Sequence, residues 1–463
     1  MAIETTASAP RPDQKVAERD LTSGSIHRAI WYLAPAMMLE TGILNVADFL
    51  DVYWVSRLGS AALAAVTMGI AIRWLTQSIS MGLGIGGLAV VARRTGAQDR
   101  EAADHATGQT ILLGVLTSIC LTIFGLILSR PLLQLLGADA GVQALGMTYL
   151  RITFLGSIAW VLVYVINPML RGAGEAKLAM QVLMMTTVAI IIAEPILVLG
   201  LGPVPRLGMA GSAAAYVLGM GCGMLMQIAI LVRGKARIGL RLRHLRPDLR
   251  LMARITGIAL PSTVQMTLRA ASNMVILAMI GAHGTFATAA FGLADRLLFF
   301  ALVPCFGLGN VSGTLVGQNL GAERPGRAER SAWWVSAYAA VYMLAVGILA
   351  FVFARPLIMA FDATPAVVAI GVECTRIIAL SLVLDGVGFV LNRGLDGAGD
   401  TLPAASINLL TLWALEIPAA FALSRGLGLG LMGIWLGRAL ANTANGLFFI
   451  IWFKRGKWKE REV

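Results

Sequence analysis

The chain contains few charged residues, few cysteines and few histidines. Only 13% of its 463 residues are charged, whereas soluble domains carry about 25%. Its four cysteines form no CxxC pair, and its four histidines have no metal-binding spacing. No HExxH or phosphate-loop pattern is present, and residues 1–25 lack the apolar stretch of a signal peptide. These absences argue against a soluble enzyme, a disulfide scaffold and a protein that holds a cofactor.

Apolar residues, by contrast, make up 57% of the chain and fall in long runs. A membrane-spanning helix needs about 20 such residues. Runs of this kind predict an all-α polytopic membrane protein with twelve spans, at about 26–54, 62–92, 106–129, 142–169, 178–201, 208–232, 255–281, 286–316, 331–354, 365–392, 402–424 and 427–453.

Basic residues gather in alternate loops. If residues 1–25 form a cytoplasmic tail, the outer loops hold only Arg57, Arg130, Arg206, Arg355 and Arg425. The positive-inside rule then predicts that both termini are cytoplasmic. The net charge of +12 needs no nucleic acid to explain it. We expect an N-terminal lobe at 26–232, a basic cytoplasmic linker at 233–254, a C-terminal lobe at 255–453, and a basic tail at 454–463 that meets membrane lipid.

The two halves repeat each other. Residues 170–175 (LRGAGE) match 395–400 (LDGAGD), and in the same register 82–84 match 307–309 and Gly96 matches Gly321. Each half holds six spans, so the lobes should be related by a pseudo-two-fold axis along the membrane normal. Transporters place the substrate path between such halves, although a channel can also be built from repeats.

Acidic residues inside the spans are the main candidates for function. The first predicted span contains Glu40, Asp48 and Asp51, and the fifth contains Glu194. No basic residue lies near them in the sequence. Carboxylates that share one cavity repel each other and so favour uptake of H⁺ or Na⁺; the alternative is that each is hydrated near a helix end. Pro35 is expected to act as a hinge in the first span.

The second lobe carries charges of both signs. Asp385 lies in mid-span and is a candidate second site, but it could instead neutralise Arg269. Trp160 and Tyr164 could stack on a cationic ligand, whereas aromatic residues in spans are also common as interface anchors.

Several segments together resemble one transporter family. Residues 51–59 (DVYWVSRLG), 171–174 (RGAG), 315–322 (LVGQNLGA) and 396–401 (DGAGDT) are similar to motifs of the multidrug and toxic compound extrusion (MATE) family. The resemblance implies two six-helix lobes arranged as a V. It also implies export of varied, often cationic, drugs in exchange for H⁺ or Na⁺. We expect a monomer in the bacterial inner membrane.

The resemblance also assigns individual residues. Asp51 matches the family's cation-coupling aspartate, Glu194 stands where an Asp-Pro is usual, and Ser212 supplies an accompanying hydroxyl. Asp48 replaces a usual asparagine. Arg269 takes the place of a glutamate found in the NorM-type branch, so the chain looks closer to the DinF-like branch, with H⁺ favoured over Na⁺. No metal is expected beyond Na⁺ at this acidic site.

These observations lead us to expect a cation-coupled drug antiporter that works by alternating access. The alternative is a flippase of lipid-linked or polysaccharide precursors from the same superfamily. A passive channel and a membrane enzyme are weaker rivals, the latter because no catalytic spacing occurs in the spans.

Overall fold

The computed structural model describes residues 20–201 and 205–461, apart from the side chains of residues 44–49. In this part of the chain it is helical and has no β-strand. The N-terminal lobe consists of α1 (Ile26–Ser56), α2 (Ser60–Gly96), α3 (Arg100–Leu135), α4 (Ala140–Leu155), α5 (Ser157–Gly172), α6 (Ala176–Leu199) and α7 (Met209–Val232).

The segment between the lobes contains the short helix η1 (Leu242–Leu245). The C-terminal lobe consists of α8 (Leu249–Gly281), α9 (Thr285–Gly321), α10 (Pro325–Val352), α11 (Ala354–Met359), α12 (Pro365–Ala379), α13 (Leu382–Ala398), α14 (Thr401–Asn408), η2 (Leu409–Glu416), α15 (Ile417–Phe421), η3 (Ala422–Gly426), α16 (Leu431–Arg455) and η4 (Lys457–Glu460). Helix α8 begins inside the predicted linker, because the Asp248 side chain accepts hydrogen bonds from the first N–H groups of the helix.

The helices are long and apolar enough to cross a membrane. Within the described residues, nine continuous spans meet this test, and two further spans are pairs of helices, α4 with α5 and α12 with α13. Helix α1, 31 residues long, occupies the first predicted span. The two pairs bend by 56° and 54° at equivalent places in the repeat. The predicted all-α fold of two pseudo-symmetric six-helix lobes is therefore confirmed.

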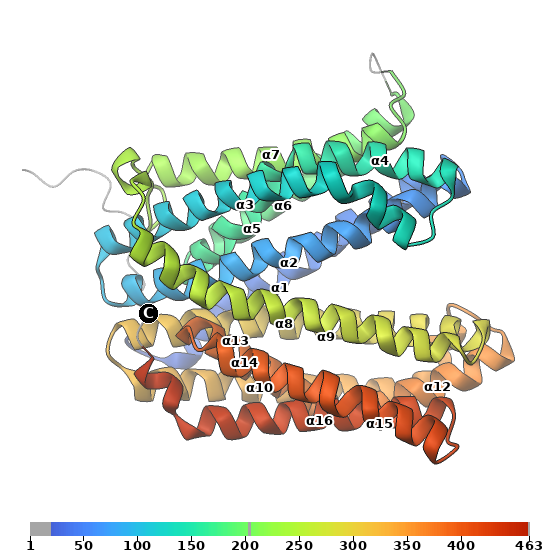
Figure 1. Cartoon of the computed structure of the whole chain (residues 1–463). Helices are drawn as coiled ribbons and strands as arrows, with labels where there is room; N and C mark the ends of the chain where they lie inside the picture. Colours follow the sequence, from blue (N-terminus) through green and yellow to red (C-terminus); the bar gives the residue numbers. More distant parts are fainter. Residues whose placement is uncertain (1–19, 202–204, 462–463) are drawn as a thin grey trace, which may run out of the picture.

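The two lobes approach each other at one end of the molecule. Figure 1 shows the helices of both lobes meeting near the C-terminus and diverging towards the opposite end. We call the end that holds the C-terminus and the inter-lobe segment the termini end. Here Thr314 of α9 donates a hydrogen bond to the carbonyl oxygen of Arg171 at 3.1 Å, which ties the second lobe to the end of α5.

Helices α2 and α9 cross at two glycines that the repeat relates. A Cβ atom on Gly96 would lie 1.9 Å from the carbonyl oxygen of Gln318, and one on Gly321 would lie 1.9 Å from the carbonyl oxygen of Arg93. Only glycine permits so close an approach. Beside the crossing, the Gln318 amide donates to the carbonyl oxygen of Gly172 at 2.7 Å. The lobes are thus closed against each other at the termini end.

Candidate functional site

The first candidate site lies within the N-terminal lobe. The Ser212 hydroxyl on α7 donates a hydrogen bond of 2.6 Å to the Asp51 carboxylate on α1, and Asp51 is only 7% exposed. Glu194 on α6 is 1% exposed. Glycine lets α7 pack closely on α6, since a Cβ on Gly211 would lie 2.3 Å from the carbonyl oxygen of Leu197. The structure therefore joins Asp51 to Ser212 and buries Glu194 in the same lobe.

Two other candidate residues, Asp48 and Pro35, also belong to α1. The side chain of Asp48 lies outside the described residues. Pro35 lies inside α1, which continues through it as one helix. Because proline has no N–H, the ladder of hydrogen bonds lacks one bond at this position, so its role as a hinge stays a prediction.

Glu40 differs from the sequence expectation. Its carboxylate pairs with the Arg171 guanidinium at 2.5 Å and accepts a hydrogen bond from Asn167 at 2.8 Å. The side chain of Glu40 is 2% exposed. No basic residue lies near Glu40 in the sequence, but the fold gives it a basic partner, so the expectation of an unpartnered acid is wrong for Glu40. The predicted spans leave Arg171 in the loop after residues 142–169, whereas it occupies the last turn of α5 and lines the cavity.

A central cavity of about 270 Å³ lies between the lobes. Helices α1, α2, α5, α6 and α7 line it from one side, and α8, α9 and α13 line it from the other. Its walls are mostly apolar, with full charges at Glu40, Arg171, Arg393 and Asp396. This volume lies just below the range for drug-sized pockets, about 300–1,000 Å³. Asp51 and Glu194 do not line it.

The two aromatic candidates, Tyr164 and Trp160, differ in their access to the cavity. Tyr164 lines the cavity. Trp160 is fully buried in the core of the N-terminal lobe, and its indole N–H donates to the carbonyl oxygen of Thr153 at 3.2 Å across the bend between α4 and α5. The suggestion that Trp160 stacks on a ligand is therefore wrong, because no ligand in the cavity can reach its ring.

The second-lobe candidates lie in a mixed polar network and are not among the residues that line the cavity. Asp385 on α13 interacts electrostatically with Arg269 on α8. Arg269 also donates to the Asn408 side chain at 3.3 Å, and nearby Ser272 donates to Glu416 at 3.1 Å. Neither Asp385 nor Arg269 lines the cavity. This arrangement agrees with the alternative in which Asp385 neutralises a base.

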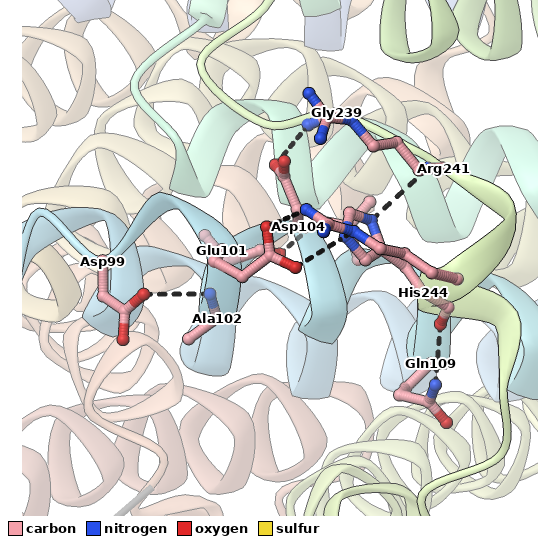
Figure 2. A network of polar contacts seen from close by, with 11 residues as sticks. Asp99, Glu101, Ala102, Asp104, Gln109, Gly239, Arg241 and His244 are labelled. Carbon is pink, nitrogen blue, oxygen red and sulfur yellow. Dashed lines mark hydrogen bonds and ion pairs between the residues drawn. The ribbon is translucent and has the colours of Figure 1, made fainter.

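The inter-lobe segment is anchored on the start of α3. Gln109 donates to the carbonyl oxygen of His244 at 2.8 Å, and Asp104 accepts a hydrogen bond from the N–H of Gly239 (Figure 2). Nearby, Arg237 lies 3.7 Å from Glu175. Burial raises the pKa of Glu175, and the charge of Arg237 opposes that rise. The segment is thus fixed to the N-terminal lobe.

The same region gathers metal-type ligands that sequence spacing did not reveal. One ligand atom each from Glu101, Asp104 and His244 lies within 4.8 Å of the others, and Figure 2 shows them side by side. However, Glu101 already pairs with Arg243, and Asp104 is bound to the N–H of Gly239. A cation would have to displace both donors, so we interpret the cluster as the anchor of the segment.

Comparisons with known proteins agree with this architecture. A family model described as MatE matches residues 36–196 and 261–422. The chain is 25% identical over 446 residues to "Probable multidrug resistance protein YoeA" of Bacillus subtilis, covering 95% of this chain and 96% of that protein. It is 26% identical over 411 residues to "FAD transporter" of Shewanella oneidensis, covering 88% and 90%.

The fold also has a solved counterpart. A structure described as "Crystal structure of MATE in the bent conformation" matches with a TM-score of 0.89 at 24% identity, over 94% of this chain and 97% of that one. At this identity the match shows the fold. Since the family model fills most of both lobes, the chain belongs to the MatE family, the multidrug and toxic compound extrusion family.

Proposed function

We propose that this chain exports varied, often cationic, drugs or toxic metabolites in exchange for a cation. Its relative in Bacillus subtilis is named a multidrug resistance protein, and its relative in Shewanella oneidensis an FAD transporter, so small organic molecules are the common cargo. A mostly apolar cavity with a few charged groups, shared by two lobes, suits such cargo. A lipid-linked precursor would need a larger or open groove, so we favour drugs over the flippase alternative.

The main support for the proposal is that the acidic site and the central cavity are separate. The buried pair of Asp51 and Ser212 lies in one lobe, whereas the cavity is shared by both lobes and is not lined by Asp51. A cation that binds the acidic site and a drug that binds the cavity can then favour different conformations. This difference in affinity between states is what coupling requires.

The conformation fits one stage of an alternating-access cycle. If the termini end is cytoplasmic, as the positive loops predict, the crossing at Gly96 and Gly321 closes the cavity towards the cytoplasm. The opposite end, where the lobes diverge, would face outward (Figure 1). The protein would then act in the inner membrane as a monomer, with bending of α1 near Pro35 accompanying drug release.

We favour H⁺ as the coupling ion and the DinF-like branch of the family. Coupling through the N-terminal lobe suits a chain with Asp51 and Glu194 there and with Arg269 within electrostatic range of Asp385 in the second lobe. The positive charge of that guanidinium opposes the binding of Na⁺ at Asp385.

Proteoliposomes containing ethidium test the function. A proton gradient imposed alone should drive uphill dye movement, and a sodium gradient alone should not. Asp51→Asn should abolish this movement while the protein folds normally. The same change at the partly exposed loop residue Asp362, which does not line the cavity, is the control and should leave transport intact. Normal coupled export by Asp51→Asn would overturn the assignment.

A further inference from the structure

Four full charges line the central cavity, two from each lobe. Arg171 pairs with Glu40 across α5 and α1, and Arg393 pairs with Asp396 within α13 at 3.1 Å. The cavity is therefore neutral overall. Arg171 and Arg393 line this one cavity from opposite lobes, so one ligand can meet both guanidinium groups.

These four groups are only partly satisfied by the protein. Glu40 Oε2 and Asp396 Oδ1 are buried and accept no hydrogen bond from the described residues. The Nε atoms of Arg171 and Arg393 are buried and donate none. A guanidinium has five N–H donors, and each of these two gives one hydrogen bond to its acid. Buried polar atoms without partners are rare and call for a ligand or water.

The aromatic side chains beside these charges indicate what the rest of such a ligand would be. The Phe389 ring lies 5.2 Å from the Arg393 guanidinium, and Phe306 meets Phe389 edge to face at a centroid distance of 4.7 Å. All three residues line the cavity. An aromatic body can therefore pack on these rings while a charged substituent reaches the arginines.

We propose that Arg171 and Arg393 form an anion subsite, which holds the carboxylate of a zwitterionic aromatic substrate. The cationic group of that substrate would lie beside the carboxylates of Glu40 and Asp396, which line the same cavity. A zwitterion leaves the cavity neutral, whereas a simple cation must be accommodated next to two guanidinium groups. This inference rests on the proposed transport function and adds a substrate class to it.

Two dyes with the same aromatic body provide the test. Rhodamine 110 carries a free carboxylate, and rhodamine 123 is its methyl ester and a simple cation. Binding to the purified full chain is measured by fluorescence polarisation, and export is measured in proteoliposomes. The test variant is Arg393→Gln with Asp396→Asn, which removes the pair without changing the net charge. The control is Lys459→Gln with Glu329→Gln, which removes a 2.6 Å ion pair outside the cavity.

The test variant should weaken binding of rhodamine 110 by about tenfold or more, as expected for a lost charge-assisted hydrogen bond. Its binding of rhodamine 123 should change by less than about threefold. The control should change neither. Arg393→Lys, which keeps the charge without the planar fork, should give an intermediate loss for rhodamine 110 alone.

The outcomes separate this inference from the transport proposal. An unchanged ratio of the two affinities, or an equal loss for both dyes, would overturn the anion subsite even if export is normal. Selective loss of rhodamine 110 binding supports the subsite even if the wild-type protein exports neither dye, and in that case the transport proposal fails on its own.

Discussion

The glycine crossing of α2 and α9 allows a quantitative prediction about the closed state. A Cβ on Gly96 would lie 1.9 Å from the Gln318 carbonyl oxygen, and real Cβ contacts are essentially never below 3.0 Å. The obstacle is backbone on both sides, so no side chain can rotate away. Gly96→Ala therefore requires the two helices to move apart by about 1 Å, and overpacking of this kind costs about 1–3 kcal/mol.

That cost falls only on conformations in which the termini end is closed. The equilibrium between closed and open forms should then shift about 5- to 150-fold towards the open form. Gly321→Ala should have the same effect, because its Cβ would lie equally close to the Arg93 carbonyl oxygen. The double variant should shift the equilibrium by less than the sum, since one added Cβ already separates the helices.

Electron–electron distance measurements between spin labels can detect the shift. Labels at the exposed residues Arg100 of α3 and Arg330 of α10 report on the two lobes at the termini end. Cys120 and Cys222 are exposed and must first be replaced. Gly257→Ala on α8 is the matched control, because its Cβ would meet no atom within 4 Å.

The expected result is a longer distance population in Gly96→Ala and Gly321→Ala, and none in Gly257→Ala. If the distance distributions of all three variants match the wild type, the crossing does not control closure. The reasoning would then be refuted, whatever the effect of the variants on transport.

Three further predictions concern single side chains. Ser212→Ala should slow cation-driven export about tenfold or more by removing the hydrogen bond to Asp51, while Ser212→Thr retains activity; initial rates in proteoliposomes decide this. Trp160→Ala should destabilise the protein by about 3–5 kcal/mol in thermal unfolding without changing the relative affinities for the two rhodamines, because its ring fills the core. Burial opposes ionisation of Asp20, but hydrogen bonds from neighbouring hydroxyls and the charge of Arg324 keep its pKa below the ordinary value. Its stabilisation is present at neutral pH and lost as the pH falls through that lowered pKa, so Asp20→Asn should lower the Tm at neutral pH and have little effect in strong acid.

The spans could be predicted from the sequence because each apolar run is long enough to cross a membrane by itself. The bends in the fourth and tenth spans could not. They occur at Gly156 and at residues 380–381, where no proline interrupts the run. Such bends arise from packing between helices, and a single span carries no signal for them.

For a similar reason, only part of the candidate site could be predicted from the sequence. The contact of Ser212 with Asp51 was suggested by resemblance to a family, since their separation along the chain gives no hint of it. The partner of Glu40 was missed because counting loop charges assigns an arginine at a helix end to the loop. In the structure, Arg171 extends from the last turn of α5 into the cavity.

The repeat explains why some features occur twice and others do not. The close crossing needs a glycine on each helix, so Gly96 and Gly321 are both retained. In the same register, Arg171 corresponds to Asp396, and the charge is reversed. An arginine at position 396 would add a third cation to a cavity that already holds Arg171 and Arg393, and it would leave Glu40 as the sole lining carboxylate. Reversal keeps the cavity neutral while the lobes are closed, which lowers the cost of burying its charges. The backbone contacts of the two lobes therefore follow the symmetry of the fold, whereas the charges of the cavity depart from it.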